Sequence, residues 1–155
     1  MEIQSKLLGT IEYTEENIIR FDEGLIGIPD KKNFLLIEKE DFKPFSYLQS
    51  VDDPAFILIV VNPMIVEKEY KFSIYKDDLN AIGIKSENDF SLLAIVIFAQ
   101  KIEHITVNLK APIIINVHTK QALQVILQND DYSVEEPLVK NVPDKPDGSD
   151  IFNTR

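Results

Sequence analysis

The sequence predicts an all-β fold, mainly antiparallel, in which short strands form a closed, strongly bent β-barrel with one or two short helical turns. The apolar runs are short, rich in isoleucine and valine, and separated by clusters of Asp, Asn, Pro, Lys or Glu, which is typical of an antiparallel barrel or sandwich. Between these runs the sequence lacks the amphipathic stretches of roughly 10 or more residues that a doubly wound α/β fold requires.

The chain is predicted to begin with a β-hairpin. Apolar residues in 3–8 and 10–13 flank Gly9, and glycine is a common turn residue between short strands. Residues 18–21 form the next apolar run, which Asp22 ends. These patterns predict three short strands in the first part of the chain.

The segment GLIGIPD, residues 24–30, is predicted to be a loop with an apolar surface. Its two glycines permit positive φ and its proline blocks regular pairing. Leu25, Ile26 and Ile28 are nevertheless apolar. We expect the loop to fold back over a barrel mouth; the alternative is an exposed hydrophobic contact for a partner protein.

Eight further strands and two weak helical turns are predicted from the remaining pattern. The strands are residues 34–37, 47–50, 56–61, 70–75, 92–98, 105–109, 113–117 and 123–127. The helical turns are residues 31–34 and 77–82, and Asp77 or Asp78 is expected to cap the second of them.

Residues 105–116, ITVNLKAPIIIN, contain a change in strand character. Ile105 and Val107 alternate with polar residues, as in a strand with one buried face. Pro112 has no backbone N–H, so it is best placed at the first residue of a strand or on a sheet edge. The three isoleucines after it predict a strand that is buried on both faces.

Length and composition predict one domain, residues 1–138, followed by a flexible tail, residues 139–155. A chain of 155 residues with 45% hydrophobic content can form a single core, whereas the tail contains prolines and no apolar period. The longest apolar run, residues 92–99, is too short to cross a bilayer. With no cysteine and no secretory signal, the expected location is cytoplasmic.

The net charge of −10 argues against direct binding to nucleic acid. Sixteen basic residues stand against 26 acidic ones, and Arg20 and Arg155 are the only arginines. An acidic surface would instead speed the encounter with a basic protein, although the same charge also serves solubility.

No catalytic residue, cofactor site or metal site is predicted, and the chain is not expected to be an enzyme. His104 and His118 are conceivable metal ligands together with a carboxylate, but their spacing favours two surface or strand-end histidines. The sequence has no Gly-x-Ser-x-Gly motif and no phosphate-binding glycine loop. Adjacent carboxylates are expected to lie in solvated turns and not in a hydrolase site. These pairs are Asp52 and Asp53, Asp77 and Asp78, Asp130 and Asp131, and Glu135 and Glu136.

Several ordered blocks between residues 3 and 138 resemble the FliW flagellar assembly factor family. They are FDEGLIG (21–27), FSYLQS (45–50), PAF (54–56), ITVNLKAPIIIN (105–116), QVIL (124–127) and Tyr132. One departure concerns the residues after the tyrosine, where the family usually carries an arginine before its next proline. Here Ser133, Val134, Glu135 and Glu136 precede Pro137.

This resemblance implies the same barrel and a regulator without enzymatic activity. Proteins similar to FliW bind the RNA-binding translational regulator CsrA and relieve its repression of flagellin synthesis, with flagellin as the competing partner. The alternatives are a flagellin-dedicated chaperone and a small-ligand-binding barrel protein. The expected partner-binding residues are Leu25, Ile26, Ile28, Phe45 and Tyr47 as apolar contacts, and Asp52, Asp53, Glu135 and Glu136 as an acidic docking face.

Overall fold

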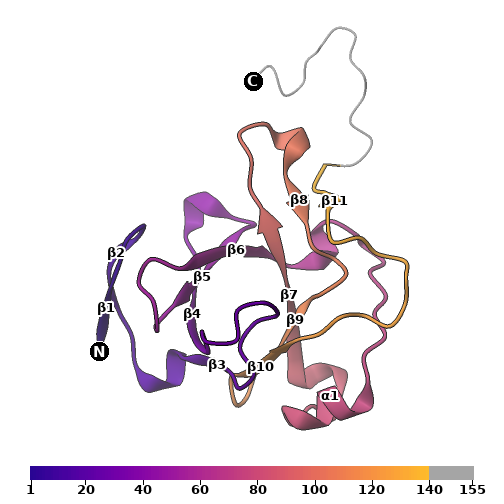
Figure 1. Ribbon diagram of the computed structural model, residues 1–155, viewed down its shortest axis with the longest axis horizontal. Coiled ribbons are helices and arrows are strands. Elements are labelled where there is room, and N and C mark those ends of the chain that lie inside the picture. The colour runs from indigo at the N-terminus through magenta and orange to yellow at the C-terminus, as the bar shows by residue number, and fades with distance from the viewer. Residues whose placement is uncertain (140–155) are drawn as a thin grey trace, which may run out of the picture.

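A computed structural model describes residues 1–139 and consists mainly of short strands (Figure 1). The predicted tail lies outside the described residues except for Val139. The strands are β1 (Glu2–Ser5), β2 (Gly9–Glu12), β3 (Ile19–Phe21), β4 (Asn33–Ile37), β5 (Ser46–Ser50), β6 (Ile57–Val61), β7 (Phe90–Ile97), β8 (Thr106–Val107), β9 (Ile113–Asn116), β10 (Gln121–Gln124) and β11 (Glu136–Pro137).

Strands β7, β6, β5, β4, β3, β10 and β9 follow one another as hydrogen-bonded neighbours, and β9 pairs back with β7 to close the ring. The closure depends on the length of β7. Its first half pairs with β9, from Phe90 opposite Asn116 to Leu93 opposite Ile113, and its second half pairs with β6. Strands β8 and β11 extend the sheet beyond the ring, and β1 and β2 form a separate hairpin. The predicted closed β-barrel is confirmed.

One pairing in the ring is parallel. Arg20 in β3 lies opposite Gln121 in β10, and Phe21 lies opposite Ala122, whereas the other strand pairs are antiparallel. A parallel pair needs a long connection between its strands. Here that connection contains strands β4 to β9. Because this is the one parallel pair in the ring, the sheet is mainly antiparallel, as predicted.

The interior of the barrel is filled by apolar side chains from all sides of the ring. Phe34 is fully buried and packs edge-to-face on Phe21, with ring centroids 5.4 Å apart, and on Phe56 at 6.3 Å. Ile113 and Ile115 point into this interior cluster. Ile114 instead joins a second cluster on the outer face, so the strand after Pro112 is buried on both faces, as predicted.

The corner between β8 and β9 is held by hydrogen bonds from three directions. The Asn108 side-chain oxygen accepts bonds from the N–H groups of Lys110 and Ala111, at 3.1 and 3.0 Å. The buried Tyr70 hydroxyl donates to the Leu109 carbonyl at 2.5 Å, and the Pro112 carbonyl accepts from Val125. Pro112 immediately precedes the first residue of β9, which is the kind of position its missing donor favours.

Several predicted elements are wrong or displaced. Residues 70–75 form no strand, and the predicted turn at 31–34 is instead the start of β4, because Asn33 and Phe34 pair with β3. The predicted strand at 123–127 is β10, which begins and ends earlier. The helix predicted at 77–82 is α1 (Lys76–Ala81), whose cap position is Tyr75, so the two aspartates lie inside its first turn.

Helical turns are more numerous than predicted. Besides α1, residues 1–139 contain five 3₁₀ turns, at Glu15–Asn17, Glu40–Phe42, Pro63–Ile65, Glu87–Asp89 and Ile102–His104. Within the same residues, the structure has no helix with the length and hydropathy needed to cross a membrane.

Candidate functional site

An apolar groove, here called the mouth groove, lies beside the loop that crosses the barrel opening. Its volume is about 390 Å³. Ile26, Ile126 and Val134 line it with exposed fractions of 50, 60 and 55%. Leu58 and Ile95, which also pack against the interior cluster, line it too. Exposed apolar side chains gathered around a hollow are typical of a protein contact surface.

The conformation of Gly24 determines the path of the loop that borders the mouth groove. Its φ is +70°, and a Cβ atom at this position would lie 2.5 Å from the Pro29 Cα and 2.6 Å from the Pro29 carbonyl oxygen. Glycine is therefore required both for the dihedral angle and for the close approach of the two backbone segments. The loop closes through paired bonds between Leu25 and Ile28, at 3.2 and 2.8 Å.

Gln124 ties this loop to the β8–β9 corner. Its side-chain oxygen accepts a hydrogen bond from the Ile26 N–H at 2.9 Å, and its side-chain amide donates to the Ala111 carbonyl at 3.0 Å. One side chain of β10 thus sets the distance between two walls of the mouth groove.

The structure gives the three predicted loop residues different roles. Leu25 is 2% exposed and belongs to the barrel interior, Ile28 is half-buried against it, and Ile26 points outward into the mouth groove. Figure 1 shows the indigo loop between β3 and β4 lying across the middle of the ring. The loop therefore closes the barrel mouth, as expected, and also presents an apolar side chain at the surface.

The acidic segment after Tyr132 lies next to the mouth groove. Val134 lines the groove, and Glu135 follows it as an exposed residue whose N–H is bonded to the Ser133 hydroxyl at 2.9 Å. Glu136 opens β11 and lies opposite Val107 of β8. The fold thus places this segment beside Ile26, although the sequence separates the two by more than half the chain.

Phe45 and Tyr47 lie in a different place, an aromatic cluster at the start of β5. Phe42 stacks on Tyr47 with ring centroids 4.5 Å apart, and Phe98 packs edge-to-face on Phe45 at 5.4 Å. Phe98 and its neighbour Ile97 are 46% and 59% exposed. None of these side chains lines the mouth groove.

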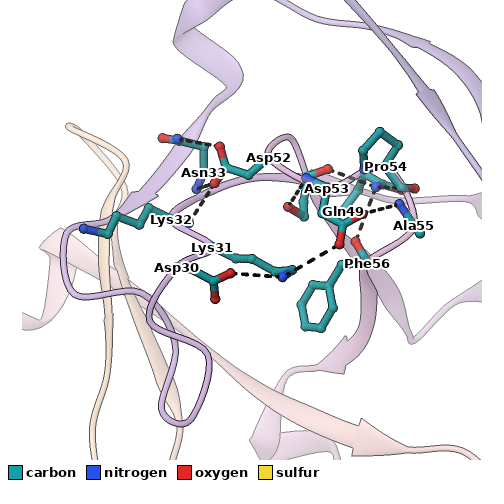
Figure 2. A network of polar contacts seen from close by, with 11 residues as sticks. Asp30, Lys31, Lys32, Asn33, Gln49, Asp52, Asp53, Pro54, Ala55 and Phe56 are labelled. Carbon is teal, nitrogen blue, oxygen red and sulfur yellow. Dashed lines mark hydrogen bonds and ion pairs between the residues drawn. The ribbon is translucent and has the colours of Figure 1, made fainter.

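Asp52 follows the other end of β5 and fixes the start of β4 (Figure 2). Its carboxylate accepts hydrogen bonds from the N–H groups of Lys32 and Asn33 at 2.8 and 3.0 Å, and from the Asn33 side-chain amide at 3.2 Å. Asp53 accepts from the Ala55 N–H at 3.0 Å and lies 3.7 Å from the Lys31 ammonium. Both carboxylates are thus engaged within the fold, and β5 separates them from the aromatic cluster.

Replacing Asp52 by alanine is expected to lower the free energy of unfolding by about 1–2 kcal/mol at pH 7, because the two backbone donors lose their acceptor. Burial raises the pKa of Asp52, but the hydrogen bonds from Lys32 and Asn33 and the Lys31 charge outweigh it and hold the pKa below its ordinary value of 3.8. A depressed folded-state pKa means that this stabilisation is present above the ordinary value and is lost as the pH falls through the folded-state value.

Urea denaturation of the native chain and of Asp52→Ala at pH 7 and at pH 3 measures this difference. The matched control is Asp30→Ala. Asp30 is exposed, and its carboxylate forms an ion pair with the Lys31 ammonium at 3.5 Å, a kind of contact that contributes little to stability at the surface. Equal midpoints for the two variants at pH 7 would contradict the bracing role of Asp52.

The two histidines lie apart from each other. His104 ends a 3₁₀ turn before β8, and His118 lies beyond β9, where its Nε2 is 3.2 Å from the Asp89 carboxylate. Among residues 1–139, no group of three or more His, Asp or Glu side chains is arranged to hold a metal ion.

Sequence reasoning missed Ile126, Leu58 and Ile95 as lining residues of the mouth groove. Each was assigned to a strand by its apolar neighbours, and the pattern does not say which strand ends meet at the barrel mouth. Ile126 had the clearest signal, because in the predicted strand over residues 123–127 it lies on the same face as the polar Gln124, opposite the face of Val125 and Leu127.

Comparison with known proteins shows which family this chain is similar to. The family model described as FliW protein matches residues 2–138. Two relatives, both named flagellar assembly factor FliW, come from Caldanaerobacter subterraneus subsp. tengcongensis and Thermoanaerobacter pseudethanolicus. They are 38% and 37% identical, each over 92% of this chain and 95% of its own length. A crystal structure of the flagellar assembly factor FliW superposes with a TM-score of 0.85 at 35% identity, covering 92% of this chain and all of that one.

Proposed function

Because this chain belongs to the FliW family, we propose that it serves in flagellar assembly as a binding protein and not as an enzyme. The observation that carries this proposal is the mouth groove, a hollow bordered by the exposed side chains of Ile26, Ile126 and Val134. Such a surface can exclude water with a partner protein. Its one ionisable lining residue among residues 1–139 is Lys110, whose ammonium is bonded to the Asn129 carbonyl and to Asp130, so the lining offers no pair of acid and base groups.

The proposed partners are CsrA and flagellin, bound one at a time. Binding of this chain would withdraw CsrA from its repression of flagellin synthesis, and accumulating flagellin would release CsrA again. The net charge of −10 supports a basic regulator as one partner, because complementary potentials raise the association rate. The mouth groove supports an apolar segment of flagellin as the other, since apolar grooves accept amphipathic segments.

The mouth groove can supply a useful share of the affinity for such a segment. Completing the burial of Ile26, Ile126 and Val134 contributes roughly 1 kcal/mol each, given that about half of every side chain is already covered. Roughly 3 kcal/mol corresponds to a factor of about a hundred in the dissociation constant. Glu135, an exposed residue directly after the lining residue Val134, adds a negative charge to this segment, whereas the lining itself carries the positive charge of Lys110.

Replacing Ile126 by aspartate is expected to weaken the binding of purified flagellin at least about tenfold, because a charge would have to be desolvated in the mouth groove. Isothermal titration calorimetry measures the change. The matched control is Leu7→Asp, since Leu7 is 61% exposed but lies in the β1–β2 turn. An equal affinity of both variants would remove the mouth groove from flagellin binding.

The exchange of partners is tested separately by displacement. A preformed complex with CsrA is challenged with flagellin on a size-exclusion column, and release of free CsrA is the expected result. A ternary complex that elutes intact would contradict exclusive binding. Recovery of flagellin without any binding of CsrA would instead favour a chaperone dedicated to flagellin.

A further inference from the structure

Residues 71–75, between β6 and α1, are not part of the sheet, although Tyr75 at their end has extended backbone dihedral angles. Their side chains alternate as in a strand: Lys71, Ser73 and Tyr75 are exposed, whereas Phe72 and Ile74 are half-buried against the outer core. The sequence pattern predicted a strand here for that reason. No strand among residues 1–139 pairs with this segment.

Within the described part of the chain, hydrogen bonds occupy one edge of this segment. The Lys71 N–H donates to the Tyr132 hydroxyl at 2.7 Å, and the Ser73 carbonyl accepts from the Gln128 N–H at 3.3 Å. Within residues 1–139, the N–H and C=O groups of Phe72 and Ile74 have no hydrogen-bond partner. In an extended chain both groups of a residue point to the same edge, so no described residue is hydrogen-bonded to the edge that carries the N–H and C=O groups of Phe72 and Ile74.

A large groove, here called the lysine groove, lies along this segment. Its volume is about 1140 Å³, and its apolar lining includes Leu79 of α1 and Phe90 of β7. Lys71, Lys76 and Lys85 also line it, and Glu87 is the one acidic lining residue among residues 1–139.

The three lysines of the groove are exposed and have no ion-pair partner among residues 1–139. A cluster of unpaired cations is unusual in a chain whose net charge is −10. It gives the lysine groove a local charge of the opposite sign to the molecule as a whole.

We propose that the lysine groove binds an acidic segment of a partner protein in extended conformation, added as a strand along residues 71–75. Hydrogen bonds from the partner's backbone to Phe72 and Ile74 would provide affinity whatever the partner's sequence, and alternate side chains of the partner segment would provide specificity. Carboxylates on one face of the added strand meet the lysines, while apolar side chains on its other face enter the groove beside Leu79 and Phe90.

The charges exclude two other occupants of this edge. Pairing of the same edge from two copies would bring Lys71 and Lys76 of one copy against those of the other, and like charges placed opposite each other destabilise a strand pair. A basic partner, such as the regulator in the proposed function, meets the same repulsion. The occupant of this edge is therefore an additional, acidic partner, which binds independently of the mouth groove.

The test uses a synthetic peptide in which glutamate and valine alternate over seven residues. Titration into the full chain, followed by amide nuclear magnetic resonance, is expected to shift the N–H signals of Phe72 and Ile74. A peptide of the same sequence with N-methyl groups on alternate amides, which removes the backbone donors on one edge, should not bind. Binding of the methylated peptide with equal affinity would overturn strand addition.

Charge dependence is tested with the double variant Lys71→Glu and Lys85→Glu, for which the peptide affinity should fall at least about tenfold. The matched control is the double variant Lys68→Glu and Lys101→Glu, which changes two exposed lysines outside the groove by the same net charge. Equal loss in both would overturn the site.

Two further measurements separate the lysine groove from other occupants and from the mouth groove. Self-association of the native chain that the lysine groove variant abolishes would assign the edge to a second copy and overturn the acidic partner. The Ile126→Asp variant should bind the peptide as the native chain does, since Ile126 does not line the lysine groove. Failure of flagellin binding therefore leaves this inference untouched.

Discussion

Replacing Gly24 by alanine is expected to lower the free energy of unfolding by about 3 kcal/mol, a large part of the stability of a domain of this size. A non-glycine residue at φ +70° costs about 1–2 kcal/mol. The new methyl group would also lie 2.5 Å from the Pro29 Cα, in backbone that can move only if the loop opens, and overpacking of this kind costs about 1–3 kcal/mol. Urea denaturation followed by circular dichroism measures the loss.

Gly27→Ala is the matched control for this prediction. Gly27 has a similar φ of +83°, but nothing lies within 4 Å of the position a Cβ would take. The free energy of unfolding of Gly27→Ala should fall only by the cost of the positive φ, about 1–2 kcal/mol. If the two alanine variants unfold at the same urea concentration, the close approach of Pro29 does not matter to stability. Leu25, the residue after Gly24, is packed in the barrel interior and also lines the mouth groove. Opening of the loop would therefore distort the mouth groove as well.

Replacing Asn116 by alanine should lower the free energy of unfolding by about 3 kcal/mol, because this buried side chain satisfies three backbone groups. Its amide donates to the Ile82 carbonyl at 2.7 Å, and its oxygen accepts from the N–H groups of His118 and Thr119 at 2.9 and 3.2 Å. These bonds fasten the end of β9 to the residue that follows α1, so hydrogen exchange of the α1 amides should become faster as well.

Asn62→Ala serves as the comparison for Asn116→Ala, because Asn62 also accepts a backbone hydrogen bond, from Met64 at 2.9 Å, but is exposed. The Asn62→Ala change is expected to lower the free energy of unfolding by about 1 kcal/mol, the ordinary cost of losing a helix cap. A smaller effect at Asn116 than at Asn62 would mean that the buried carbonyl of Ile82 finds another donor.

Much of the fold is predictable because the pattern along each strand reflects its burial. The three isoleucines after Pro112 are buried on both faces because β9 lies between the barrel interior and the outer core. Residues 70–75 show the limit of this reasoning. Their alternation is real, but whether an extended segment becomes part of a sheet depends on a neighbouring strand, which its own residues do not specify.

The candidate site is less predictable than the fold because distant segments build it. Composition singled out the GLIGIPD loop, yet the paired bonds between Leu25 and Ile28 decide that Leu25 faces inward and Ile26 outward. Asp52 looked like a surface charge beside aromatic residues. The register of β5 places it at the opposite strand end from Phe45 and Tyr47, where it receives backbone donors.

The parallel pairing of β3 with β10 imposes an order of events on the chain as it is made. Gln121 leaves the ribosome about a hundred residues after Arg20, its partner across the seam. Until β10 has been synthesised, one edge of β3 has no partner strand and is free to pair with other nascent chains. A chain truncated before β10 would therefore keep nearly all of its hydrophobic residues but lack the strand that joins β3 to β9 and closes the barrel. We expect such a fragment to be insoluble.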